Sequence, residues 1–287
     1  MDQLLESINS AEIDMHQLTK LTSSPILISK EIDDILIQYI SIGATVEYDG
    51  SFQKDYYGFS ISNQGTQSFY NGKKVTKKSF LIIKPLSSFQ GIVINKLESI
   101  TISIKKELIH LLFGDIKSGI YYLDNSNILT NFYNFLYNLL HSKLKIIECQ
   151  MSDVIFNKIL YLMINSVTSN NNTNKYYDKF KLISDYIHNH LDKDMSIQEI
   201  AKEFNVTDRT IRNIFSYSLG LSPKQYQKSL RLNHLKKTII KEKNNTITDS
   251  IRIQKMQYQS LIAKDFKNLF GQTPNQFKVL WKNKHFK

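Results

Sequence analysis

The chain lacks several features that mark whole classes of protein. It has a single cysteine, Cys149, in 287 residues, which excludes an internal disulfide and a cysteine-based zinc site and fits a reducing cytoplasm. The first thirty residues contain no basic start followed by an apolar stretch, and no segment approaches about 18 uninterrupted apolar residues. We therefore expect a cytoplasmic protein with no export signal, no membrane span and no membrane partner.

Histidine is missing where a catalytic barrel would need it. Residues 25–104 contain short β-type runs such as ILIQYISI and SITISI, separated by turn residues that include Asn71-Gly72, a type I′ hairpin signal. Strands at this spacing predict a small sandwich or barrel, in particular a cupin-like jelly roll. With no histidine in the span, its strands cannot form a His-based metal site. Its many Tyr and Phe side chains can form a core or line an apolar pocket for a small molecule.

Helical patterns flank this β-rich part. Residues 1–20 predict a short amphipathic helix, and residues 105–167 predict further helices. One of these, FYNFLYNLL at 132–140, is apolar nearly all round, which predicts burial on two sides, between domains or between two copies of the chain. Residues 168–175, TSNNNTNK, are polar and predict a linker. The fold class that we expect is α+β, with a sensor or dimerisation domain at 1–167 and an all-α domain at 176–287.

Positive charge is concentrated at one end of the chain. Residues 1–175 contain 16 Lys and Arg against 16 Asp and Glu, whereas residues 176–287 contain 21 against 10, which accounts for the whole net charge of +11. Such a distribution indicates a domain that binds a polyanion. A basic membrane-surface region is the alternative, but the charges lie among capped amphipathic helices and do not form one wide lysine-rich face.

Residues 196–218 predict a helix-turn-helix. Ser196 and Glu199 form a capping-box signal, Asn205 lies at a turn that favours a left-handed residue, and Thr207 is the N-cap of a second helix. An ordinary helix with a solvated polar face would look similar from this segment alone. The outward face of the second helix nevertheless carries side-chain types that donate to bases or phosphates, namely Arg209, Arg212, Asn213 and Ser216.

A repeat strengthens the DNA-reading interpretation. FSYSLGLSPKQY at 215–226 and FKNLFGQTPNQF at 266–277 both fit F-x4-G-x-[ST]-P-x-Q-[YF], with an offset of 51 residues. A second helix-turn-helix is therefore predicted at 246–269, joined to the first by a helix over 223–241 whose Lys224, Lys228, Lys236 and Lys237 are expected outside. The outward residues predicted for the second reading helix are Gln259, Ser260, Ala263, Lys264 and Lys267.

With these motifs the chain resembles the AraC family of bacterial transcription regulators. The elements TDRTIRNIF, LGLSPKQY and KDFKNLFGQTP carry the resemblance over about residues 176–280, and they look most like the branch that contains the ethanolamine-utilisation regulator. The resemblance implies that both reading helices face the major groove, through Arg209, Thr210, Arg212 and Asn213 in the first and Gln259, Ser260, Ala263 and Lys264 in the second. The second unit departs from the pattern at Ser250, usually apolar, and at Lys255, usually glycine.

The function that we expect is a DNA-binding transcription regulator without catalytic activity, cofactor or metal. Its expected partners are double-stranded DNA, a small-molecule effector, a second copy of the chain and, for an activator, RNA polymerase. Two alternatives remain open from the sequence. One is an enzyme-like barrel tethered to a nucleic-acid-binding tail, and the other is a non-specific DNA-binding or adaptor module.

Overall fold

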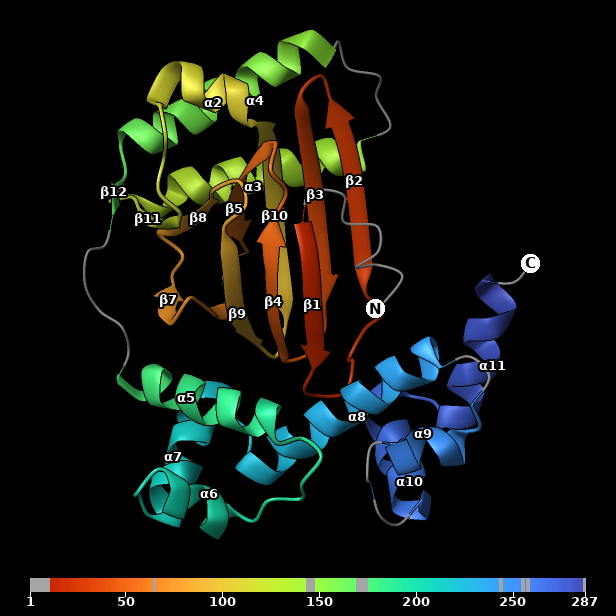
Figure 1. Cartoon of the computed structure of the whole chain (residues 1–287). Coiled ribbons are helices and arrows are strands. Elements are labelled where there is room, and N and C mark those ends of the chain that lie inside the picture. Colours follow the sequence, from red (N-terminus) through yellow and green to blue (C-terminus); the bar gives the residue numbers. More distant parts are fainter. Residues whose placement is uncertain are drawn as a thin grey trace. The chain divides into compact units, whose positions relative to one another are not determined.

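The structure is a computed structural model that describes residues 11–63, 66–142, 148–168, 175–242, 245–253, 256 and 259–285. The chain divides into two compact units, which we describe separately (Figure 1). The first unit comprises Met1–Met15, Ser23–Gly43 and Glu47–Thr173. The second comprises His16–Thr22, Ala44–Val46 and Asn174–Lys287. The second unit therefore includes two short segments from the N-terminal part of the chain.

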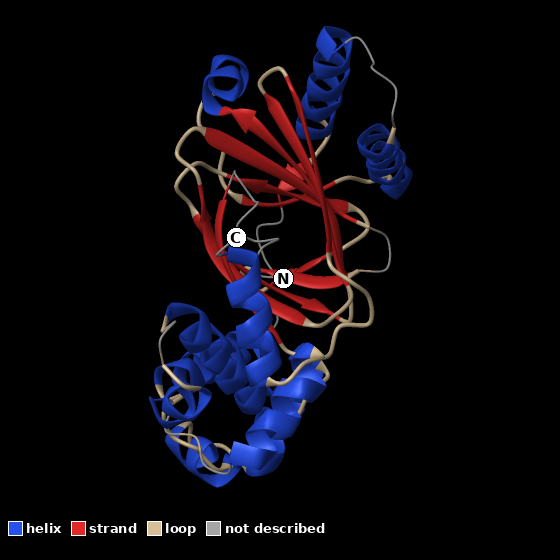
Figure 2. Ribbon diagram, turned by 90° about the vertical axis from the view of Figure 1, so that its right-hand side faces the viewer, coloured by secondary structure: helices blue, strands red, loops and turns tan. Residues whose placement is uncertain are grey.

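The strands of the first unit form two sheets that face one another (Figure 2). The five-stranded sheet has the order β1 (Ala11–Gln17), β4 (Val46–Phe52), β9 (Ser88–Ile94), β6 (Gln67–Tyr70), β7 (Lys73–Val75). The seven-stranded sheet has the order β12 (Val167–Thr168), β11 (Gly119–Tyr122), β8 (Ser79–Ile83), β5 (Tyr56–Ser62), β10 (Leu97–Lys105), β3 (Ile35–Ile42), β2 (Ile26–Ile32). The α+β class is confirmed, but the strands form two sheets and not one closed barrel.

The predicted hairpin is present between β6 and β7. Tyr70 pairs with Lys73 across it, and the two turn residues have positive φ angles, 44° at Asn71 and 83° at Gly72. Positive φ at both central residues is the requirement of a type I′ turn, which asparagine and glycine meet at low cost. This local sequence signal therefore predicted the hairpin correctly.

Three helices accompany the seven-stranded sheet: α2 (Lys106–Phe113), α3 (Ser126–His141) and α4 (Glu148–Ile164). The sheet directs an apolar face towards them, because Ile37, Phe59 and Ile102 are buried in one cluster with side chains of α3 and α4. The alternation of a strand places neighbouring residues on opposite faces, so this arrangement leaves Gln38, Ser60 and Thr101 on the other face, towards the five-stranded sheet.

Three expectations for this unit are wrong. Residues 11–17 form strand β1 instead of continuing a helix over 1–20, and residues 1–10 lie outside the described part. Helix α3, which contains FYNFLYNLL, is buried on one side only, because Asn131, Asn134 and Asn138 are exposed along its other face. Its apolar side packs on the sheet of its own unit. Strand β11 contradicts the expectation that residues 105–167 are helical, because residues 119–122 pair with β8 instead.

Helices build most of the second unit: α5 (Lys175–Asn189), α6 (Ile197–Glu203), α7 (Asp208–Leu219), α8 (Pro223–Lys241), α9 (Ile247–Ile253), α10 (Gln259–Phe270) and α11 (Pro274–His285). One aromatic cluster lies between α5, α7 and α8, where Phe180 is 5.1 Å from Phe215 and 5.7 Å from Tyr226 between ring centroids. A second core joins α8 to α9, α10 and α11 around Leu235, Ile262 and Phe266. Helix α8 is thus shared by both cores.

The N-terminal segments of the second unit are buried against α8 and α10. The backbone N–H of Gln17 donates to Asn233 Oδ1 (3.2 Å), and Asn233 Nδ2 donates to the carbonyl of Gln17 (2.7 Å). Gln17 Nε2 donates to the Leu269 carbonyl at 2.7 Å, which provides a partner for a carbonyl in the last turn of α10. Ser229 Oγ donates to the Leu18 carbonyl at 2.9 Å. These bonds make Gln17 part of the helical unit.

None of the described helices combines the length and the apolar character needed to cross a bilayer.

Candidate nucleic-acid interface

The first helix-turn-helix is built by the local signals that its sequence contains. Ser196 and Glu199 form a reciprocal capping box, in which the Ser196 N–H donates to Glu199 Oε2 (2.6 Å) and the Glu199 N–H donates to Ser196 Oγ (3.2 Å). The backbone N–H of Ser196 holds the pKa of the Glu199 carboxyl below its ordinary value. Asn205 has a φ of 48° in the turn, and the Thr207 side chain accepts from the Thr210 N–H at the start of α7.

Helix α7 separates an apolar face from a polar one. Ile211, Ile214 and Phe215 are buried at no more than 1% exposure, and Phe215 lies in the aromatic cluster with Phe180 and Tyr226. All four polar side chains predicted at i, i+3, i+4 and i+7 are exposed on the other side of the helix, namely Arg209, Arg212, Asn213 and Ser216. The helix therefore presents a polar face at the surface of the second unit.

The two arginines of α7 are available to an anionic partner. Neither Arg209 nor Arg212 forms an ion pair with any other residue that the structure describes. Thr210 is different, because it is only partly exposed and its hydroxyl lies 2.9 Å from the hydroxyl of the N-cap residue Thr207. The Thr210 hydroxyl therefore already interacts with the N-cap of α7. A contact from this hydroxyl to a base would have to form in addition to that interaction.

The second helix-turn-helix consists of α9 and α10. Thr246 caps α9, because its hydroxyl accepts from the Asp249 N–H at 3.1 Å and its N–H donates to Asp249 Oδ2 at 3.1 Å. Ser250 is fully buried, but its hydroxyl donates to the Thr246 carbonyl at 3.1 Å, so the polar group in the core has a partner. Lys255, the residue expected in place of glycine, lies outside the described residues.

The predicted reading residues of α10 divide into three groups. Gln259 and Ser260 lie in the first turn of the helix, but their side chains are outside the described part. Ala263 is partly exposed. Lys264 and Lys267 are exposed. The opposite side of α10 is buried at Ile262, Phe266 and Leu269, so α10 resembles α7 in having one face in a core and one at the surface.

The sequence repeat is also a structural repeat. Each reading helix is followed by a left-handed glycine, Gly220 with φ 69° and Gly271 with φ 80°. Each glycine precedes a capping box that begins the next helix: Ser222 with Gln225, and Thr273 with Gln276, the two backbone-to-side-chain bonds of each box measuring 2.9–3.3 Å. A shift of 51 residues along the chain therefore relates each residue of the first helix-turn-helix to its equivalent in the second.

That equivalence shows how the two surfaces differ. Arg212 of α7 corresponds to Ala263 of α10, and Asn213 corresponds to Lys264. Thr210 corresponds to Leu261, whose side chain is 58% exposed. Leu261 was not among the predicted residues, although the repeat alone would have placed it on the surface. An exposed apolar side chain on a reading helix is suited to contact a thymine methyl group.

A second exposed residue was also missed, on α7. Tyr217 is 69% exposed, and its ring stacks on that of Tyr176 from α5 with centroids 5.1 Å apart. The pair extends the surface of α7 by two hydroxyl groups. No periodic signal separates Tyr217 from an ordinary surface residue, because its neighbour in space is about forty residues away in the sequence.

Other basic residues of the second unit are engaged elsewhere. Lys228 pairs with Asp265 at 3.1 Å, and Arg231 pairs with Asp194 at 3.5 Å. Lys236 was expected outside but is only 6% exposed, and its ammonium group lies 5.0 Å from the ring centroid of Phe270. The long apolar stem of lysine allows such burial when an aromatic face receives the charge. Lys228, Arg231 and Lys236 thus already have partners within the unit, so fewer basic side chains are available to DNA than the composition suggests.

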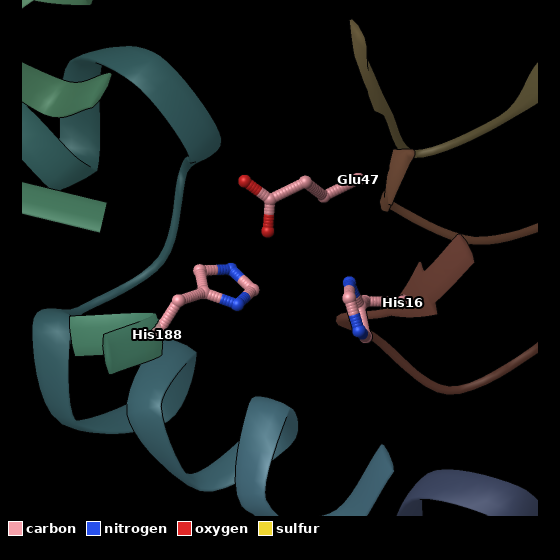
Figure 3. A group of neighbouring side chains, drawn as sticks. All are labelled: His16, Glu47 and His188. Carbon is pink, nitrogen blue, oxygen red and sulfur yellow. The ribbon is translucent and has the colours of Figure 1, made fainter. Parts of the chain in front are cut away.

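Two histidines of the second unit lie close together, His16 and His188, with ring centroids 5.3 Å apart (Figure 3). His188 Nε2 is 3.2 Å from the Tyr226 hydroxyl, and Lys237 Nζ donates to His16 Nε2 at 3.2 Å. Two imidazoles supply fewer ligands than the three or four of a protein zinc site. Among the described residues, no third His, Cys, Asp or Glu of the same unit completes a metal-binding group with them, and we assign no metal to the pair.

Comparison with known proteins identifies residues 190–279 as a helix-turn-helix domain. The chain is 27% identical over 96 residues to the probable transcriptional regulator LumQ of Photobacterium leiognathi, covering 33% of this chain and 38% of LumQ. It is 22% identical over 210 residues to YtdP, an HTH-type transcriptional regulator of Bacillus subtilis (strain 168), covering 60% of this chain and 27% of YtdP. The chain thus spans well under half the length of these curated relatives.

Among solved structures, the AraC-like transcriptional activator CuxR is similar with a TM-score of 0.42 and 14% identity, over 77% of this chain and 85% of CuxR. ToxT from Vibrio cholerae is similar with a TM-score of 0.33 and 11% identity, over 95% of this chain and 99% of ToxT.

Proposed function

We propose that the whole chain is a transcription regulator of the AraC type, which reads double-stranded DNA through α7 and α10 and responds to a small molecule through its first unit. The match of residues 190–279 to a helix-turn-helix domain supports this proposal. The role requires binding and a change of binding, and no catalytic chemistry. A second copy of the chain, and RNA polymerase in the case of an activator, are further proposed partners.

The observation that carries the proposal is the paired design of the second unit. Two helices at an offset of 51 residues have the same left-handed glycine and the same capping box behind them, and each exposes one polar or basic face. A recognition helix needs this combination, because one face must be fixed in a core while the other approaches base edges. A helix that served only as packing would not need the second, basic face.

The length of α8 fits the spacing of two major-groove segments. The helix has 19 residues, which corresponds to roughly 28 Å at about 1.5 Å per residue. Successive major-groove segments on one side of B-DNA are about 34 Å apart. Because both cores pack on α8, the helix can act as a rigid spacer between two reading helices. We propose that α7 and α10 enter consecutive segments of the groove on one face of the duplex.

The two reading helices would then contribute unequally. Helix α7 presents two guanidinium groups and a carboxamide, through Arg209, Arg212 and Asn213, which are the side chains that pair with guanine and adenine in two-bond geometry. Helix α10 has alanine in the place of Arg212 and lysines at 264 and 267, and lysine acts on phosphate mainly as a point charge. We propose that α7 supplies most of the sequence discrimination and α10 mostly backbone affinity.

The test is selection of a binding site from random duplexes with the full chain, followed by footprinting and a binding series over singly substituted sites. Arg212→Ala is expected to cost about 1–3 kcal/mol and to relax the preference at one base pair. Lys224→Ala is the matched control, because Lys224 is exposed on α8, outside both reading helices.

Three outcomes would count against the proposal. No protected site in the footprint would favour a non-specific DNA-binding or adaptor module. Equal losses on every sequence would make Arg212 a phosphate contact. Larger penalties under the half-site of α10 than under that of α7 would reverse the ranking of the two helices.

A further inference from the structure

A groove of about 850 Å³ lies within the second unit, between the first half of α8 and α10. Lys228 and Arg231 of α8 line one wall, and Leu261 and Asp265 of α10 line the other. Helix α7 packs on Tyr226 near the start of α8, whereas α10 packs further along the same helix (Figure 1). The groove therefore lies between the two reading helices.

The groove adjoins the reading surface of α10. Leu261 lines it and is 58% exposed, and the repeat equates Leu261 with Thr210 at the start of α7. When two helices enter consecutive segments of the major groove, the intervening minor groove and its two rows of phosphates pass between them. The groove is thus placed where one of these rows is expected.

One wall of the groove carries a carboxylate that packing does not require. The offset of 51 residues equates Asp265 with Ile214, which is 1% exposed in the core of the first helix-turn-helix. Asp265 instead pairs with Lys228 of the other wall, Oδ1 to Nζ at 3.1 Å, and the two side chains are 31% and 49% exposed. An ion pair with this much exposure contributes little to stability, so it can open at small cost.

Arg231 has unused donors in the same groove. Its ion pair with Asp194 is long, 3.5 Å from Nη1 to Oδ1. Its buried Nε–H has no acceptor among the residues that the structure describes. A guanidinium group offers five donors in a planar fork, which matches the oxygens of a phosphate. The contacts within the chain therefore leave much of this capacity unused.

We propose that this groove holds one row of phosphates of the duplex, between the two half-sites, and that Lys228 exchanges Asp265 for a phosphate when DNA binds. Arg231 donates to the same row. Asp265 is then a built-in competitor that weakens DNA binding, because its bond to Lys228 must break first. The position between half-sites rests on the proposed function above, but the competition does not, since a phosphate carries no sequence information.

The test measures the dissociation constant of the full chain for two duplexes, the selected site and a scrambled duplex of equal length, over a range of salt concentrations. Asp265→Asn is expected to raise affinity about 2- to 5-fold on both duplexes, the fold-change that corresponds to an exposed ion pair. Lys228→Ala should lower affinity on both and reduce the slope of log affinity against log salt by about 0.9. A misfolded fraction would lower affinity without this change of slope.

A double-mutant cycle separates exchange from simple repulsion. If Asp265 acts by occupying Lys228, Asp265→Asn has no effect once Lys228 is replaced by alanine. If Asp265 only repels DNA, its replacement raises affinity in both backgrounds. Asp185→Asn and Lys179→Ala are the matched controls, because both residues are exposed on α5 and neither is among the described residues that line the groove. They should leave affinity and salt slope nearly unchanged.

Ethylation of single phosphates locates the contact on the duplex. With the selected site and the parent chain, we expect ethylation to interfere with binding at phosphates between the two half-sites. With Lys228→Ala, the interference at one of these phosphates should disappear, because the lysine that contacted it is gone. With Lys179→Ala, the pattern should be that of the parent chain.

Three results would overturn the inference: unchanged affinity in Asp265→Asn, an equal gain from this substitution with and without Lys228, or no interference by ethylation between the half-sites. Misfolding of Asp265→Asn cannot imitate the expected gain in affinity. If the footprint shows no protected site, the proposed function fails, but the cycle on the scrambled duplex still tests the exchange at Lys228. A footprint together with a failed cycle rejects the exchange alone.

Discussion

Replacement of Asn233 by alanine should strongly destabilise the second unit. Asn233 is 3% exposed on α8, and its side chain satisfies both backbone groups of Gln17, accepting from the N–H (3.2 Å) and donating to the carbonyl (2.7 Å). Asn233→Ala leaves these two groups without their partner. A buried polar group that loses its partner costs about 1–3 kcal/mol, so the expected loss in the free energy of unfolding is about 2–6 kcal/mol.

The chain offers an internal probe for this measurement. Trp281 is the single tryptophan, and it packs against the core that α8, α9, α10 and α11 share. Its fluorescence during urea unfolding of the full chain therefore reports on the second unit. Free energies extrapolated to zero denaturant for the parent chain and the variant give the difference directly.

Two further variants make the reasoning refutable. Ser229→Ala removes one hydrogen bond, to the Leu18 carbonyl, and is expected to cost about 1–3 kcal/mol, less than Asn233→Ala. Lys224→Ala, exposed on the same helix, should change stability by no more than about 0.5 kcal/mol. If Asn233→Ala cost less than about 1 kcal/mol, or no more than Ser229→Ala, the inclusion of Gln17 in the core of the helical unit would be wrong.

Three other predictions concern DNA binding and pH. Residues 176–287 expressed alone should prefer the same DNA site as the full chain, but unfold at lower urea concentration because they lack the segment around Gln17; a fragment as stable as the full chain by Trp281 fluorescence would contradict this. Lys267→Ala should weaken binding equally on all sequences and lower the slope of log affinity against log salt by about 0.9, whereas a sequence-dependent loss would make Lys267 a base reader. Because the Ser196 N–H lowers the pKa of Glu199 from its ordinary value in the folded state, ionisation of this carboxyl stabilises α6 at neutral pH, and the contribution is lost as the pH falls through the lowered pKa. Glu199→Gln should therefore be less stable than the parent at neutral pH, with a gap in urea midpoint that narrows as the solution is acidified; a constant gap would refute the role of charge.

The C-terminal unit could be predicted from the sequence because its signals are local. Capping residues at Ser196, Thr207 and Ser222, and the left-handed Gly220, act within four residues of their partners, so the pattern alone specifies the helix boundaries. The helix-turn-helix prediction for this part of the chain is confirmed by the match to a helix-turn-helix domain over residues 190–279. The roles of individual reading residues stay predictions.

The first unit was less predictable because its determinants are distant in the sequence. Strand β1 was mistaken for the end of a helix because that prediction rested on the apolar residues before it. Within β1 itself, Ala11, Ile13 and Met15 alternate as they do in a strand, and β4 pairs beside them. The row of Gln38, Ser60 and Thr101 is visible only from the strand register. Likewise, the bond from Gln17 to Asn233 joins residues 216 positions apart, which no periodicity can reveal.

The matching caps of the two reading units make them exchangeable parts. Because each reading helix is followed by the same glycine and the same box, a shift of 51 residues converts any outward position of α7 into its counterpart on α10 without disturbing the scaffold. Ala263→Arg together with Lys264→Asn would copy the pair Arg212 and Asn213 of α7 onto α10. A protein engineer could use this correspondence to build a chain that reads the same half-site twice, with operator symmetry set by substitution instead of by dimerisation.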